Sequence, residues 1–191
     1  MKNVLCLLLA CAMMLVSMLA LVSCDPASVL VGTESDAESS TEVSTKEEVV
    51  IPEDYQTYSN SDLSFAYPKD WTKQDGSVVV LSGSNGNNVT VVYENKTDMY
   101  EKMTVDSFNA ELKPALQAAG MEVSDVSIEK KTTNSLSVVV LSFKATMNGV
   151  SMKQTGYIIT LGDKTYTVTV TEVQPDAELV ATVLDTLQAA S

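Results

Sequence analysis

The sequence predicts an α+β domain with a largely antiparallel sheet, and three observations lead to that fold class. Segments that alternate between apolar and polar residues, rich in β-branched side chains, recur from residue 63 to residue 173. Turn-forming residues separate these segments at short intervals, as in a meander of hairpins. Two stretches with apolar residues three and four apart interrupt or follow the series. Two main helices packed on a meander of strands are typical of an α+β sandwich.

The first strands are predicted soon after residue 60. Leu63–Tyr67 alternates with period two and ends at Pro68, whose ring removes a backbone hydrogen-bond donor. Two apolar segments, 77–81 and 88–93, flank the turn-rich residues 83–87. This arrangement predicts a hairpin.

The first helix is expected to begin after Thr104, a suitable N-cap, and to stop at Gly120. Pro114 lies inside this stretch, where it should kink or split the helix. The expected buried stripe consists of Phe108, Leu112, Ala115, Leu116 and Ala119.

Four strands should follow, at 123–131, 136–147, 150–161 and 164–173. Asn148-Gly149 joins two of them, and Asn-Gly between alternating segments is a strong hairpin signal. The last strand alternates Tyr and Val with threonine. We expect its apolar face in the core and its threonine face in water; the threonines are Thr165, Thr167, Thr169 and Thr171.

The second helix is predicted at the end of the chain. Pro175 suits its first position, and Asp176 and Glu178 favour the positive end of the helix dipole. Its expected buried stripe is Val180, Val183, Leu184 and Leu187.

Residues 1–23 have the pattern of a lipoprotein signal peptide. Lys2 is the only charged residue before Asp25, and an almost wholly apolar stretch follows it. Leu21-Val22-Ser23-Cys24 closes the stretch and resembles a bacterial lipobox. Cleavage is therefore expected between Ser23 and Cys24, with Cys24 carrying diacylglycerol and acyl chains such as palmitate. This anchor would hold the protein at the cell membrane, on its extracytoplasmic face.

An uncleaved membrane-spanning helix is the alternative for this segment, because spanning takes roughly 17–25 apolar residues. Two features favour cleavage instead: a cysteine ends the apolar run, and no basic cluster follows it.

Residues 24–54 are expected to form the lipidated cysteine and a disordered acidic tether to a domain at 55–191. From residue 25 on, the tether holds nine acidic residues against Lys46 alone, so it should repel itself and extend. Its root-mean-square reach as a coil is roughly 30 Å. A disordered partner-binding arm is the alternative, although no motif distinguishes it.

Composition limits the chemistry of the chain. It contains no histidine and no arginine, which removes histidine-based catalytic triads, imidazole zinc sites and guanidinium clamps for phosphate. The formal net charge of −13 disfavours binding to nucleic acid. After cleavage Cys24 would be the only cysteine, so no disulfide is expected. We expect no enzyme activity and no cofactor or metal.

Three aromatic residues, Tyr67, Trp71 and Tyr93, are the candidate partner-binding residues, because aromatic side chains dominate binding hot spots. The alternative places all three in the core under the first hairpin.

Two segments resemble those of PsbP-like domains. Residues 63–71 form an aromatic strand that ends in Tyr-Pro before a nearby Trp, and residues 164–169 contain a Lys-x-Tyr strand before a helix. The order of elements from residue 55 to residue 190 is also similar. The resemblance implies an αβα sandwich and a role in binding and assembly, without shared catalytic residues, as in a lipoprotein of the bacterial cell envelope.

Together these observations predict an extracytoplasmic, lipid-anchored lipoprotein that binds a protein partner without catalysis. A small-molecule binding lipoprotein that serves a transporter is the second hypothesis, and it requires a concave pocket with a few polar groups. A hydrolase that uses only carboxylates is a third.

Overall fold

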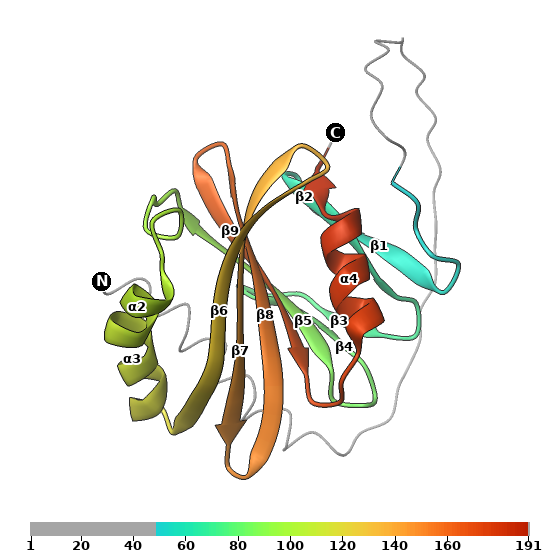
Figure 1. The fold of residues 1–191 in the computed structure, drawn as a ribbon. Coiled ribbons are helices and arrows are strands. Elements are labelled where there is room, and N and C mark those ends of the chain that lie inside the picture. The colour runs from blue at the N-terminus through green and yellow to red at the C-terminus, as the bar shows by residue number, and fades with distance from the viewer. Residues whose placement is uncertain (1–48, 191) are drawn as a thin grey trace, which may run out of the picture.

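A seven-stranded antiparallel sheet organises residues 49–190, the part of the chain that the computed structural model describes (Figure 1). Its strand order is β3-β4-β5-β9-β8-β7-β6, so β9, the last of these seven strands in sequence, lies at the centre. The strands are β3 Thr72–Gln74, β4 Val79–Ser82, β5 Asn88–Asn95, β6 Met121–Thr133, β7 Leu136–Met147, β8 Val150–Leu161 and β9 Lys164–Glu172.

A second sheet of three strands packs with the last helix against one face of the large sheet. It consists of β1 Tyr55–Ser59, β2 Leu63–Pro68 and β10 Gln188–Ala189, and the helix is α4 Ala177–Thr186. Their apolar side chains share a core with alternate residues of the large sheet. That core includes Phe65, Leu81, Val140, Tyr157, Val168, Leu179 and Val183.

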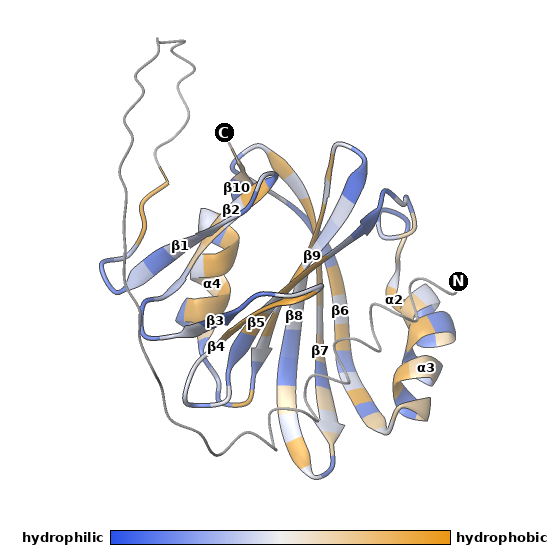
Figure 2. Cartoon of the chain, turned by 180° about the vertical axis from the view of Figure 1, so that it is seen from behind, coloured by the Kyte–Doolittle hydropathy of each residue, from blue (hydrophilic) through white to orange (hydrophobic). Residues whose placement is uncertain are grey.

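The opposite face carries a second core, closed by the interrupted helix between β5 and β6 (Figures 1 and 2). This helix comprises α2 Val105–Ser107, the π-helical turn η1 Phe108–Leu112 and α3 Lys113–Ala118. It packs on β6 and β7, and the buried residues there include Phe108, Leu112, Leu116, Val139, Phe143 and Ala145.

The sequence prediction for this helix is confirmed. Thr104 forms a capping box, with its hydroxyl accepting the Ser107 N–H at 3.2 Å. The π-helical turn interrupts the helix just before Pro114, which then occupies the first turn of α3, where a missing N–H is tolerated. Gly120 adopts a φ of 83° after the helix, a conformation that favours glycine.

The expectation that the threonine face of β9 meets water is wrong. All four threonines are buried, with exposed fractions between 2% and 9%. The physical reason is the strand order. Because β9 is the central strand, the side chains of β5 and β8 flank its threonines on both sides and shield them from water.

The last helix begins at Ala177, two residues later than the proline signal indicates. Asp176 is the N-cap, and its carboxylate accepts the Leu179 N–H at 2.9 Å, so Pro175 lies outside the helix. The helix buries Leu179, Thr182, Val183 and Thr186. Of the predicted stripe, Val183 and Leu187 are buried, and Val180 and Leu184 pack partly buried against the same core. None of the helices within residues 49–190 is both long and apolar enough to cross a membrane.

Candidate interaction surface

Tyr93 is the most exposed aromatic side chain that the structure describes, at 60%. It lies on β5 directly opposite Tyr166 of β9, and the two ring centroids are 5.5 Å apart. The Lys164 ammonium lies 5.2 Å from the Tyr93 ring centroid, a cation–π contact. Neighbours on two sides therefore order a ring that solvent can still reach.

Asp62, in the turn between β1 and β2, holds Lys164 and Tyr166 in place. Its Oδ2 atom accepts a hydrogen bond from Lys164 Nζ at 2.7 Å and a second, short one from the Tyr166 hydroxyl. The turn itself is held by Asn60, whose side-chain oxygen accepts the Asp62 and Leu63 N–H groups at 2.8 and 2.9 Å. A local Asn turn thus aims Asp62 at two residues of a distant strand.

The electrostatics of the group follow from these contacts. Hydrogen bonds from Lys164 and Tyr166 hold the pKa of the Asp62 carboxyl below its ordinary value. The hydrogen bond to Asp62 raises the pKa of Lys164. Burial, followed by the hydrogen bond to Asp62, raises the pKa of Tyr166 to about 12. At neutral pH Lys164 and Asp62 form a charged pair, and the neutral Tyr166 hydroxyl donates to the Asp62 carboxylate.

We call Tyr93, Lys164, Tyr166 and Asp62 the Tyr93 surface. A partner that covers it would meet an aromatic side chain that is already ordered, so little conformational entropy is lost on binding. A tyrosine ring surrounded by polar groups has the composition of a binding hot spot. The arrangement contains a cation and an anion already paired with each other, and it presents no nucleophile activated by a base.

The structure does not bring the three predicted aromatic residues together. Tyr67 and Trp71 are buried in the core beneath the small sheet, with exposed fractions of 6% and 8%. Only Tyr93 lies on the surface. The predicted partner-binding residues therefore separate into two core residues and one accessible side chain. No local pattern in the sequence connects Asp62 with Lys164 and Tyr166.

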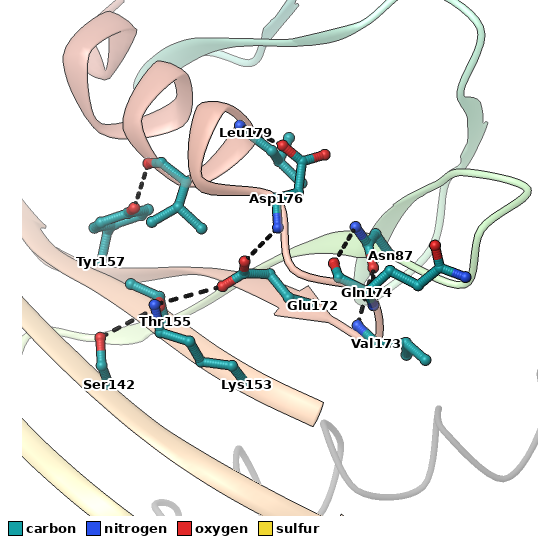
Figure 3. Close-up of polar contacts among 11 residues, drawn as sticks. Asn87, Ser142, Lys153, Thr155, Tyr157, Glu172, Val173, Gln174, Asp176 and Leu179 are labelled. Carbon is teal, nitrogen blue, oxygen red and sulfur yellow. Dashed lines mark hydrogen bonds and ion pairs between the residues drawn. The ribbon is translucent and has the colours of Figure 1, made fainter. Parts of the chain in front are cut away.

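A second polar cluster lies at the N-terminus of α4 (Figure 3). Glu172 is only 5% exposed, and its Oε1 atom accepts the Asp176 N–H at 2.8 Å. Its Oε2 atom is buried without a hydrogen bond and lies 3.7 Å from the Lys153 ammonium. The half-exposed Lys153 therefore provides charge compensation for a carboxylate that positions the start of the helix.

Neighbouring contacts in Figure 3 also serve to hold elements together. The Tyr157 hydroxyl donates to the Val180 carbonyl at 2.5 Å, and burial raises its pKa. The Asn87 side chain accepts the N–H groups of Val173 and Gln174 at 2.9 and 3.0 Å and donates to the Gln174 carbonyl. These contacts connect β8 and the β4–β5 turn to α4 and the segment before it.

The other sequence predictions concern metal and lipid. Within residues 49–190 there is no group of three or more Cys, Asp or Glu side chains arranged to hold a metal ion. Asp98, which is close in sequence to Glu101 and Asp106, forms an ion pair with Lys102 at 3.2 Å. Ser23 and Cys24 lie outside the described residues.

Comparison with known proteins identifies the fold. The sequence matches no family model and no curated protein. In a search of solved structures, the solution structure of cyanobacterial PsbP (CyanoP) from Synechocystis matches with a TM-score of 0.58 and 18% sequence identity. The match covers 74% of this chain and 95% of CyanoP.

The fold is PsbP-like. The predicted α+β class and the resemblance of residues 63–71 and 164–169 to PsbP-like domains agree with this result. The Tyr93 surface involves the second of these segments, because Lys164 and Tyr166 lie within residues 164–169.

Two further structures match with lower TM-scores. One is a Bacteroides thetaiotaomicron protein, at a TM-score of 0.45 and 14% identity over 68% of this chain and 45% of that protein. The other is a Pseudomonas aeruginosa protein of unknown function, at a TM-score of 0.35 and 13% identity over 61% of this chain and 81% of that protein.

Proposed function

We propose that this protein is a lipid-anchored binding module, held on the extracytoplasmic face of the cell membrane through Cys24, that contacts a protein partner without catalysis. The observation that carries the binding role is the Tyr93 surface. Its aromatic ring is 60% exposed yet ordered by Tyr166 and Lys164. A rigid aromatic side chain offers contact area at a low entropic cost.

The location is supported by the sequence before the folded region. The apolar run ending in Leu21-Val22-Ser23-Cys24 has the pattern of a lipoprotein signal, and two acyl chains on one cysteine give stable anchoring. The acidic segment between Cys24 and Tyr55, extended by charge repulsion, then lets the domain stand away from the bilayer surface. The lack of histidine and arginine in the whole chain supports a role without bond-making chemistry.

The anchor is tested with labelled fatty acid in cells. Wild type and the Cys11→Ala variant should incorporate the label and sediment with membranes, whereas Cys24→Ala should do neither. Cys11 is the matched control because it is a cysteine inside the same apolar segment. Equal labelling of the Cys24→Ala variant would rule out Cys24 as the attachment site.

The binding role is tested by placing a photo-crosslinking amino acid at position 93 of the anchored protein. The control carries it at position 150, an exposed apolar side chain on β8. We expect a discrete protein adduct from position 93 and none from position 150. The same adducts from both positions, or none from position 93, would contradict the proposed surface.

A further inference from the structure

The longest strand of the large sheet, β6, is also one of its two edges. It has 13 residues, whereas the other edge, β3, has three. One side of an edge strand presents backbone N–H and C=O groups that have no partner in the sheet, and such a row is a template for another strand. Among the described elements, β6 therefore offers the longest available pairing edge.

A β-bulge limits which part of β6 can pair. The register with β7 shifts between Ser124 and Ser127, and Asp125 in this bulge has a φ of 52°. From Ser127 to Thr133 the strand pairs with β7 without interruption. The regular edge is thus a seven-residue segment, Ser127–Thr133, which we call the β6 edge.

The side chains of the β6 edge carry charge in a self-complementary order. Glu129 and Lys131 point to the same face, as residues two apart in a strand do, and their side chains form an ion pair at 3.2 Å. These side chains are 59% and 47% exposed. Lys130 lies between them and points to the other face.

We propose that two copies of this protein pair antiparallel along the β6 edge, related by a two-fold axis at Lys130. Glu129 of each copy then lies opposite Lys131 of the other, which gives two cross-strand ion pairs on one face. Ile128 lies opposite Thr132 on the other face. A two-fold contact of this kind closes on itself, so pairing stops at a dimer.

Other registers are less favourable. A shift of the axis by one residue places either Glu129 or Lys131 opposite its own copy and breaks both ion pairs. The proposed register has one cost, because Lys130 lies opposite Lys130 of the second copy. Because Lys130 repels its copy and Lys131 attracts Glu129, these neighbouring lysines should have opposite effects on dimerisation.

The experiment is sedimentation equilibrium of the full chain in density-matched detergent. Glu129→Lys and Lys131→Glu should each raise the dimer dissociation constant by about tenfold, because each change turns two attractive pairs into repulsive ones. The double exchange E129K/K131E restores both pairs and should return the constant to near the wild-type value. Glu101→Lys and Lys102→Glu, which are exposed and lie outside the β6 edge, are controls with the same changes in net charge.

A second pair of variants tests the register. Lys131→Thr removes an attractive partner and should weaken the dimer, whereas Lys130→Thr removes the repulsive pair and should strengthen it. A wild-type protein that is monomeric throughout, a double exchange that fails to restore pairing, or equal effects at positions 130 and 131 would each overturn the proposal. Tyr93→Ala should leave the dimer unchanged, so this result is separate from that of the proposed function.

Discussion

The carboxylate of Asp62 accepts a hydrogen bond at 2.7 Å from the ammonium of Lys164, a residue 102 positions later in the chain. The contact joins the turn of the small sheet to the start of the central strand of the large one. Because Tyr166 donates to the same carboxylate oxygen, a single side chain on the small sheet orders two neighbours of Tyr93.

The pH dependence of stability should reveal this contact at alkaline pH. The pKa of Tyr166 is raised from the ordinary 10.0 to about 12, and that of Lys164 is also raised. A raised folded-state pKa stabilises the fold below the unfolded-state value, and that contribution is lost as pH rises through the folded-state value. Urea unfolding should therefore show a falling free energy of unfolding between about pH 10 and pH 12.

The acid side of the same contact has the opposite sign. Because the pKa of Asp62 is lowered, its contribution is present above its ordinary value of 3.8 and is lost as pH falls further. Asp62→Asn should reduce the dependence on both sides. An unchanged alkaline profile in this variant would show that Asp62 does not bridge Lys164 and Tyr166.

Gly83→Ala should destabilise the fold through Trp71. A Cβ atom at position 83 would lie 2.6 Å from the indole Nε1 of Trp71, closer than non-bonded atoms approach. Overpacking of this kind costs about 1–3 kcal/mol in the free energy of unfolding. Thermal or urea unfolding measures the loss, and the Trp71 fluorescence, expected to be blue-shifted in wild type, should shift to longer wavelength.

Gly156→Ala is the matched control for that prediction. Gly156 lies in β8, and an added Cβ would meet its neighbours at 3.8–3.9 Å, an ordinary contact distance. We expect stability to change by no more than about 0.5 kcal/mol, without a change in Trp71 fluorescence. Equal losses from both substitutions would rule out the steric explanation.

Glu172→Ala should destabilise the fold by about 1–3 kcal/mol, because the Asp176 N–H would lose its acceptor at the start of α4. Glu172→Gln retains an acceptor oxygen and should lose less. Asp98→Ala removes an exposed ion pair with Lys102 and should leave the free energy of unfolding almost unchanged, because solvent screens the pair. Urea unfolding measures the free energy of unfolding of the three variants. An equal loss of stability in Glu172→Ala and Asp98→Ala would contradict the explanation that Glu172 matters because its carboxylate is buried.

Tyr93→Ala should separate binding from folding. The side chain is 60% exposed, so the free energy of unfolding should change by about 0.5 kcal/mol or less. Binding to a partner captured at position 93 should weaken by about 2 kcal/mol, the loss typical of a hot spot. Tyr93→Phe retains the ring and should bind nearly as well; a similar loss in both variants would indicate that the hydroxyl, and not the ring, makes the contact.

Local signals in the sequence predict the long elements well. Strands β7 and β8 have the predicted bounds because Asn148 and Gly149 adopt positive φ, as the turn between them requires. The Thr104 cap and Pro114 locate the first helix and its interruption. These features depend on residues within a few positions of one another, which is why a sequence can specify them.

Short strands and distant contacts are different. The three-residue β3 and the two-residue β10 are too short to show a periodic pattern, and both exist through pairing with longer strands. The connection of Asp62 with Lys164 and Tyr166 likewise cannot be read from local spacing, because the small sheet must first pack against the large one. Of the candidate surface, the sequence indicated Tyr93 but not the residues that order it.

The sequence by itself determined the α+β class, the main hairpins, the absence of histidine and arginine chemistry, and an N-terminal pattern that predicts a lipid anchor. Only the tertiary structure decided which face of each element is buried. In β9 the alternation of valine and threonine suggested one wet face, yet the central position of the strand buries both. The same packing hides Tyr67 and Trp71 and leaves Tyr93 in solvent, because burial depends on neighbours that the chain supplies from distant positions.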